Sequence, residues 1–405
     1  MDKSDFKDIL YILVFISLFR PYIVNHWDII DFLTNALRIF VFLFLLTNWI
    51  IRCLKGYRPR VITLLMIGMQ LSILFSTIIN HGNYYRWLLE MLSPISLVFF
   101  LEQYVASISD LRNLINNWFY IIVTFLTLNI ISILLGGYKN EDWLTDYFLG
   151  SKDTFNMVFA LYAVIIYIQL ILFPNSKNLV IYCFVNILIS ILLTMSTTMF
   201  VEMIMVSGLW TFRKVSLVNK LLDYRLILLF YLISGIVLLL PEFHELFFGF
   251  LDNNLDKGSG SVQARVTMWE SGFLIFLQHS IWGIGKMTEA MWNMNVIRIP
   301  FHYQLHNQFI EYLATGGFVL FSIYFLILIF SGRNLMKYRK TSLGFFMMII
   351  YFTLLIASLM TGVYSSEFYF VFVLSFYIGS FQKDIRRLLR LEIMRLIIEL
   401  KIKER

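Results

Sequence analysis

The chain has 405 residues, of which 59% are hydrophobic and only 15% charged; its mean hydropathy is +0.75 and its net charge +7. Soluble domains carry about 45–50% apolar and about 25% charged residues. A packed core cannot hide so much apolar surface from water. The composition therefore excludes a soluble enzyme, a disordered protein, a nucleic-acid-binding domain and a disulfide scaffold, and it predicts an all-α polytopic membrane protein.

The apolar residues fall into segments long enough to cross a bilayer, which takes about 20 residues in a helix. We predict about twelve spans, which form one transmembrane domain over residues 1–381: 9–24, 29–51, 61–80, 87–105, 116–137, 154–173, 179–196, 198–212, 226–243, 308–331, 343–363 and 367–381. Only the polar run Ser196-Thr197-Thr198 separates the seventh span from the eighth.

The basic residues give the orientation of these spans. With the N-terminus on the cytoplasmic side, most of the 33 Lys and Arg residues fall in inner loops or in the tail, as the positive-inside bias requires. We therefore expect a multi-pass protein of the cell (plasma or inner) membrane with both termini cytoplasmic. The tail, 382–405, alternates basic and apolar residues at helical spacing, which predicts an amphipathic helix on the inner leaflet. The alternative is that the tail is solvated and that its basic residues only keep the C-terminus on the cytoplasmic side.

The outer loops are short except for one. A long extracytoplasmic loop, 244–307, joins the ninth and tenth spans, and a smaller one covers 138–153. This asymmetry predicts that the working surface lies on the outer face, in or under the long loop.

Ionisable groups inside a membrane are costly, so each one is a candidate for function. Arg20, Arg38 and Arg86 lie near the outer ends of the first, second and fourth spans. Guanidinium groups bind phosphate oxygens through paired hydrogen bonds, so these arginines could hold an anion. The alternative is that each reaches the headgroups or pairs with an acid such as Asp31 or Glu90.

The end of the long loop holds two histidines, His302 and His306, which are four residues apart. Such a pair can ligate zinc, but no carboxylate-rich partner segment accompanies it, and we expect neither a metal nor another cofactor. One histidine could instead act as a base toward a hydroxyl or donate to a phosphate oxygen, with Glu311 orienting it or the acceptor. The alternative is a loop histidine that bonds to a backbone carbonyl, with Glu311 paired locally.

The stretch from Arg265 to Gly317 carries several motifs. It begins with ARVTMW, continues through the Gly283-Ile284-Gly285 turn, and reaches the His306-Asn307 pair and then Gly316-Gly317. This stretch resembles the signature region of the O-antigen ligase and O-antigen polymerase (Wzy-type) superfamily. The resemblance implies a GT-C-like membrane glycosyltransferase whose donor is a glycan linked to a polyisoprenyl (undecaprenyl) diphosphate.

The resemblance also implies roles for residues. Arg265 corresponds to the loop arginine that contacts the diphosphate, and His306 to the essential histidine, either base or diphosphate contact. The family often has a Ser-Arg pair between the seventh and eighth spans, where this chain reads MSTTMF. A second cation must then come from elsewhere, and Arg86 or Arg38 is the candidate. The other expected substrate-binding residues are Asn307, Glu311, Trp269 and His302.

These features predict a metal-independent polymerase of lipid-linked oligosaccharide repeat units for a capsule, O-antigen or exopolysaccharide. Its expected partners are the lipid-linked oligosaccharide donor and acceptor, membrane lipids, and a flippase and chain-length regulator, with no nucleic acid. One alternative is an O-antigen ligase that moves the glycan to a different acceptor, such as lipid A core. Another is a polysaccharide flippase or transporter, and a non-enzymatic assembly partner also remains open. A transporter would show repeated halves, and none is evident in the sequence.

Overall fold

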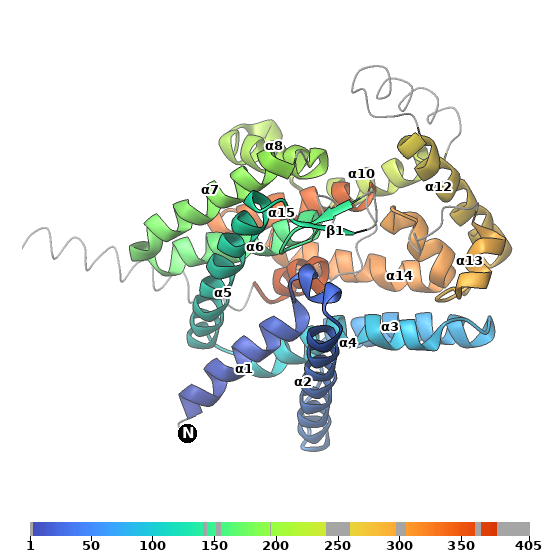
Figure 1. Cartoon of the computed structure of the whole chain (residues 1–405), viewed down its shortest axis with the longest axis horizontal. Helices are drawn as coiled ribbons and strands as arrows, with labels where there is room; N and C mark the ends of the chain where they lie inside the picture. The colour runs from blue at the N-terminus through green and yellow to red at the C-terminus, as the bar shows by residue number, and fades with distance from the viewer. Residues whose placement is uncertain are drawn as a thin grey trace, which may run out of the picture.

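The computed structural model describes residues 3–140, 144–150, 155–194, 196–239, 260–296, 305–360 and 366–378. In these ranges the chain is helical apart from one short hairpin (Figure 1). The elements in chain order are α1 (Lys3–Leu18), η1 (Tyr22–His26), α2 (Asp28–Leu54), α3 (Val61–Ile79), α4 (Tyr84–Tyr104), α5 (Ile108–Leu134), β1 (Tyr138–Asn140), β2 (Leu144–Asp146), α6 (Phe155–Leu172), η3 (Pro174–Ser176), α7 (Lys177–Thr194), α8 (Thr197–Thr211), α9 (Ser216–Leu221), α10 (Tyr224–Val237), α12 (Gly260–Gln278), α13 (Glu289–Asn295), α14 (Gln308–Met336), α15 (Ser342–Ser358) and a last helix, Ser366–Ile378.

The helices confirm the predicted fold class. Each of the predicted spans overlaps one of the helices that the structure describes. Five helices are long and apolar enough to cross a membrane by length and composition, and five more are apolar but shorter. The break between α7 and α8 lies at Ser196, as the polar run predicts. The tail, 382–405, and the beginning of the long loop lie outside the described residues.

Several predicted boundaries differ from the helix ends by five residues or more, and local chemistry explains two of them. The first span was expected to continue to residue 24, but α1 ends at Leu18, because Pro21 disfavours helical geometry in the residue before it. The fifth span was expected to begin at 116, but α5 begins at Ile108. There Ser107 accepts from the backbone N–H of Asp110, whose carboxylate accepts from the backbone N–H of Ser107, which forms a capping box.

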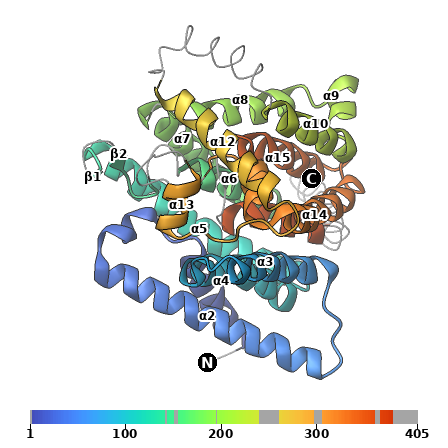
Figure 2. The ribbon, with the colours of Figure 1, turned by 90° about the vertical axis from the view of Figure 1, so that its right-hand side faces the viewer.

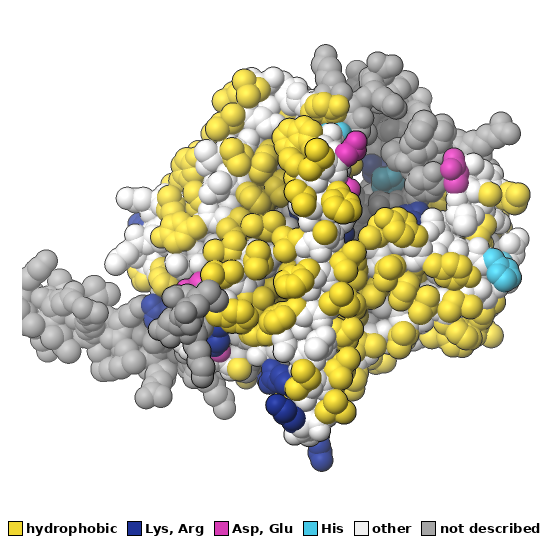
Figure 3. Space-filling view, turned by 60° about the horizontal axis from the view of Figure 1, so that its bottom comes forward, with side chains coloured by type: hydrophobic (Ala, Val, Ile, Leu, Met, Phe, Trp, Pro, Cys, Tyr) yellow, Lys and Arg dark blue, Asp and Glu magenta, His cyan; other side chains and the backbone are white. Residues whose placement is uncertain are grey.

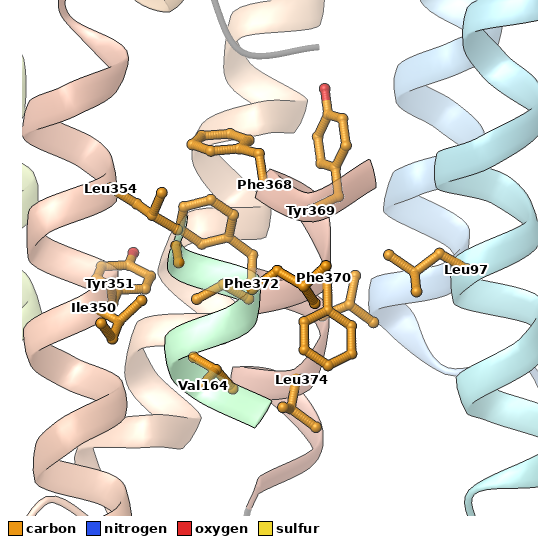
Figure 4. Packing of buried hydrophobic residues seen from close by; sticks show 14 of the residues in the cluster. Leu97, Val164, Ile350, Tyr351, Leu354, Phe368, Tyr369, Phe370, Phe372 and Leu374 are labelled. Atoms are coloured by element: carbon orange, nitrogen blue, oxygen red, sulfur yellow. The ribbon is translucent and has the colours of Figure 1, made fainter. Parts of the chain in front are cut away.

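The helix Ser366–Ile378 lies at the centre of the molecule. Figure 4 shows Phe368 and Phe372 directed toward α15, and Phe370 and Leu374 on the side that faces Leu97 of α4. The rings of Phe372 and Tyr351 meet edge to face, with centroids 5.2 Å apart. A helix that is apolar all round is buried by its neighbours, and almost every residue of this one is buried.

The predicted outer loop 138–153 contains the antiparallel hairpin of β1 and β2. The hairpin meets η1 through His26, whose Nε2 lies 3.0 Å from Oδ2 of Asp146. Near the same end, the Oγ of Ser366 donates to the carbonyl of Leu18 at 2.7 Å. Segments that the sequence assigns to the outer face are therefore in contact with one another.

Candidate active site

The turn after α12 fills a break in α14. At Gly317 the backbone is not helical (φ 59°, ψ −157°), so the local helical hydrogen bonds are interrupted. The freed carbonyls of Ala314 and Thr315 accept from the backbone N–H groups of Ile284 and Gly285, at 2.9 and 2.8 Å. The freed N–H groups of Phe318 and Val319 donate to the carbonyls of Ser280 and Ile281 at 2.8 and 3.2 Å. Each buried backbone group thus finds a partner across the break, which locks the turn into α14.

Glycine is required in this turn for two reasons. Gly283 and Gly285 have φ values of +69° and +77°, which strain other residues. A Cβ at Gly283 would collide with the backbone of Thr315 and Gly316, and one at Gly285 with the backbone of Thr77. The G-x-G motif is therefore the tight turn that the sequence predicts, and the structure shows that it lies between α3 and α14.

The turn places Lys286 beside Glu90 and Arg86, and we call these three residues the ionic cluster. The backbone N–H of Lys286 donates to Oγ1 of Thr77 at 3.0 Å, and its carbonyl accepts from the backbone N–H of Asn83 at 2.7 Å. Its ammonium, with only 5% of the side chain exposed, lies 2.5 Å from Oε2 of Glu90. The other oxygen of Glu90 accepts from Nε of Arg86 at 2.8 Å. One carboxylate on α4 therefore holds two cations, which offset its burial cost.

The N-terminus of α14 carries the His306-Asn307 motif. Asn307 is fully buried and caps the helix, its Oδ1 accepting from the backbone N–H of Ile310 at 3.2 Å. Glu311 is buried one turn later and accepts from the backbone N–H of Leu305 at 2.9 Å and from Thr315 at 3.4 Å. His306 has a φ of +50°, which is rare outside glycine and costs energy. Residues held in this way gather at functional sites.

Helix α12, which carries the ARVTMW motif, packs against α14. Gly272 packs so closely that a Cβ on it would lie 2.5 Å from Leu305 and 2.8 Å from Ile310. Arg265, Trp269 and Gly272 are spaced by four and three residues, so they share one face of the helix. Trp269 is fully buried, and Nη1 of Arg265 donates to the carbonyl of Met360, past the end of α15, at 3.4 Å. The face that carries Arg265 therefore packs on the start of α14 (Figures 1 and 2).

Beside the ionic cluster is a small internal cavity of about 20 Å³, room for about one water molecule. It is lined by Glu90, Lys286 and Thr315, together with the tyrosine pair Tyr312 and Tyr369. The two phenol groups of that pair hydrogen-bond to each other and connect α14 to the helix Ser366–Ile378. This cavity is too small for a sugar.

A second and much larger cavity of about 610 Å³ opens between α1, α2, α4 and the helix Ser366–Ile378. We call it the α1–α2–α4 cavity, and its charged lining consists of Arg20, Asp31, Arg38, Glu90 and Glu367. Because Glu90 also lines the small cavity, it belongs to both. Charged side chains also lie in a hollow on one face of the molecule, where apolar side chains otherwise dominate (Figure 3).

The three arginines singled out in the sequence have different partners, and a shared role in binding an anion stays a prediction. Arg20 lies 2.5 Å from Asp31, and Arg86 pairs with Glu90, so the alternative of local ion pairs holds for both. Arg38 donates from Nε to the carbonyl of Ser17 at 3.3 Å and lines the large cavity with Arg20. His302 lies outside the described residues, so its role in substrate binding stays a prediction.

Sequence reasoning missed two residues of the site, Lys286 and Glu367. Lys286 directly follows the second glycine of the G-x-G turn, and a lysine in a long outer loop runs against the positive-inside bias. Glu367 is the first residue of the twelfth predicted span and is buried at 7% exposure. An acid at the mouth of an apolar segment is the signal that could have revealed it.

Comparison with known protein families gives one match. Residues 179–325, which run from α7 through the first part of α14, match the family described as O-antigen ligase. This range contains Arg265, Lys286 and His306. It also contains the Gly283-Ile284-Gly285 turn and the break in α14 at Gly317 with which the turn forms its hydrogen bonds. No curated protein is similar enough to the chain to count as a match.

Proposed function

We propose that the chain, which belongs through residues 179–325 to the O-antigen ligase and polymerase superfamily, polymerises lipid-linked oligosaccharide repeat units. The superfamily consists of membrane glycosyltransferase-like enzymes of surface polysaccharide biosynthesis that act on lipid-linked glycans. The product would be a capsule, O-antigen or exopolysaccharide made at the outer face of the cell membrane from undecaprenyl-diphosphate donors. A flippase would supply these donors and a chain-length regulator would act on the product.

The observation that carries this proposal is the packing of α12 on the start of α14. It brings the arginine of the first motif and the histidine of the last motif onto neighbouring elements, although they are 41 positions apart in the chain. The N-terminus of α14 adds the positive end of a helix dipole, which favours an anion. A diphosphate leaving group fits this electrostatic setting without a metal ion.

In the proposed reaction an acceptor hydroxyl attacks the anomeric carbon of the donor sugar. A new carbon–oxygen glycosidic bond forms, and the bond from the anomeric carbon to the diphosphate oxygen breaks. His306 takes the hydroxyl proton, and Arg265 neutralises the charge that develops on the leaving diphosphate. Arg86 and Lys286, held by Glu90, replace the cation that the family often places between the seventh and eighth spans.

The family match supports a ligase as much as a polymerase, and the two share donor and fold. We favour the polymerase because the outer region available to an acceptor is small. A transporter is less well supported, because the docked turn places its charged residues at one end of α14 and not in two repeated halves.

The test replaces His306 and Arg265 by alanine in the native host and measures the length of the surface glycan. We expect long chains to disappear while single repeat units still reach the surface, because the reaction loses its base or its diphosphate contact, each worth about a hundredfold or more in rate. Arg225→Ala is the matched control, since Arg225 is an exposed arginine at the start of α10.

Long chains that accumulate on the lipid carrier would show a ligase instead. Polymer of normal length from both variants, with the proteins present at normal levels, would contradict the assignment of these two residues.

A further inference from the structure

Apart from Glu90, the α1–α2–α4 cavity is lined by residues that the proposed reaction does not use, and its size is that of a ligand site. Its volume of about 610 Å³ falls within the range of about 300–1,000 Å³ for small-molecule pockets. It lies where the end of α1, the start of α2 and the start of α4 meet the start of the last helix. All four of these ends are predicted to lie on the outer face.

The charges of the lining argue against a phosphate in this cavity. Three carboxylates, Asp31, Glu90 and Glu367, face two arginines. Arg86 and Lys286, which pair with Glu90, are not part of this lining, so the charges that line the cavity itself are three acids against two arginines. A diphosphate needs an excess of positive charge, and a lining with more acids than arginines gives it no net attraction.

The same groups suit the hydroxyl groups of a sugar. A hydroxyl donates one hydrogen bond and accepts others, so it pairs with carboxylates and with guanidinium or amide N–H groups at once. Nε of Arg38 donates a hydrogen bond to the carbonyl of Ser17. The two terminal nitrogens of Arg38 form no hydrogen bond with the residues that the structure describes. Asn35 donates to Oδ2 of Asp31 at 2.9 Å, while Oδ1 of that carboxylate holds Arg20. The carboxylate is thereby fixed in orientation.

The rim of the cavity adds an apolar surface. Tyr85 lines it with 71% of its surface exposed, so its ring is available to a ligand at the mouth. Aromatic rings supply large contact area with a polar end, which matches the alternating apolar and hydroxyl faces of a sugar ring. Asn25 of η1 also lines the cavity and is exposed.

We propose that the α1–α2–α4 cavity binds sugar residues of the glycan substrate and not its diphosphate. This inference rests on the proposed function and divides the substrate between two places. Arg265, His306 and the ionic cluster hold the reacting end, while the cavity holds sugars through Arg38, Asp31 and Glu367. Glu90, shared by the cluster and the cavity, joins the two.

The test measures binding to the purified full-length protein in lipid nanodiscs, without turnover. The probe is the repeat-unit oligosaccharide of the host's own surface glycan, released from its lipid by mild acid and labelled at its reducing end. Asn25→Trp fills the cavity from an exposed position, and Asn35→Ala removes an amide from its wall. We expect each variant to bind the oligosaccharide about tenfold more weakly, Asn35→Ala because roughly one to two hydrogen bonds are lost and Asn25→Trp because the indole occupies space that the sugar needs.

Asn113→Trp and Asn113→Ala are the controls, because Asn113 is an exposed asparagine on α5 outside the cavity. We expect them to bind as the unaltered protein does, and we expect inorganic diphosphate not to displace the oligosaccharide. Unchanged binding by both cavity variants would overturn the inference. So would displacement by inorganic diphosphate, or no binding by the unaltered protein.

The two proposals fail separately. His306→Ala should keep its affinity for the oligosaccharide, because His306 is not part of the cavity lining. If surface polymer stays normal in His306→Ala while the cavity variants lose oligosaccharide binding, the catalytic assignment fails and the sugar site stands. If His306→Ala loses polymer and the cavity variants bind normally, the sugar site fails.

Discussion

His306 combines a proposed catalytic role with an unfavourable backbone. Its φ of +50° costs a non-glycine residue roughly 1 kcal/mol or more, and the docked start of α14 holds it in place. A protein that keeps a histidine here gives up stability, because glycine would adopt this conformation without the strain. The conformation is therefore an argument for function that is independent of the family match.

Two substitutions separate the strain from the chemistry. We expect His306→Gly to be more stable than His306→Ala by roughly 1 kcal/mol, since glycine adopts positive φ freely, while both lose long-chain polymer. Thermal unfolding of the two purified variants measures the difference. Equal stability would show that the backbone at this position is not under strain in solution.

Lys286 and Glu90 form the buried pair on which the geometry of the cluster depends. Lys286→Met leaves Glu90 with Arg86 alone, and we expect the free energy of unfolding to fall by about 2 kcal/mol. This loss is smaller than the roughly 3–5 kcal/mol found when a fully buried pair is broken, because 27% of the Glu90 side chain is exposed. The double variant with Glu90→Gln should lose less than the sum of the two single variants. A double-mutant cycle on the free energy of unfolding measures this coupling.

The matched control for this cycle is the pair Lys7 and Asp110, whose lysine is 42% exposed. Exposed pairs contribute about 0–1 kcal/mol, so Lys7→Met should cost much less. A structural role for the buried pair would be contradicted if the stability losses of Lys286→Met and Glu90→Gln were additive. It would also be contradicted if Lys286→Met lost no more stability than Lys7→Met.

At the scale of elements, the docking of the G-x-G turn into the break of α14 is the feature that holds the site together. Gly285→Ala introduces both a strained φ and a Cβ that collides with Thr77. Gly56→Ala provides the matched control, because Gly56 has a similar φ of +87° and nothing within 4 Å of its Cβ position.

We expect Gly56→Ala to cost only about 1 kcal/mol of strain, and Gly285→Ala to cost roughly 1–3 kcal/mol more from overpacking and to reduce polymer. Protein level and thermal unfolding in detergent compare the two variants. If both lose the same stability, the close approach between the turn and α3 does not matter, and the account of the docked turn is wrong.

The helices and the motifs could be predicted from the sequence, because apolar length and residue spacing determine them directly. The end of α1 could have been read from Pro21, and the early start of α5 from the capping box at Ser107 and Asp110. The pairing of Arg86 with Glu90 could also be predicted, because the two residues are four positions apart on one helix. The approach of Lys286 to the same carboxylate could not, because Lys286 is about two hundred residues further along the chain and only the folded turn determines its position.

At the scale of the whole molecule, segments that are predicted to lie on the same side of the membrane contact one another. At the predicted inner end, Lys7 pairs with Asp110, and Nη1 of Arg52 donates to the carbonyl of Gln103. At the predicted outer end, Asn80 donates to the carbonyl of Gly283 at 3.1 Å. Basic side chains gather along the lower edge of the face in Figure 3, with an apolar surface above them. That the end with the candidate site faces outward stays a prediction.

Cysteine labelling tests this orientation. In a background with Cys53 and Cys183 replaced by serine, we expect Asn25→Cys to react with an impermeant maleimide in intact cells. Arg58→Cys, also at an exposed position, should react only after the cells are permeabilised. The reverse pattern would place the site on the cytoplasmic side and contradict the proposed polymerisation at the outer face.

The most direct test of the central claim gives the purified protein one substrate, the undecaprenyl-diphosphate-linked repeat unit of its host, in liposomes without any other acceptor. The account predicts a ladder of lipid-linked glycans that lengthens with time and releases one undecaprenyl diphosphate for each repeat unit added. His306→Ala should leave the single repeat unit unchanged. The absence of any ladder from the unaltered protein, with transfer only after a different acceptor lipid is added, would contradict the polymerase and establish a ligase.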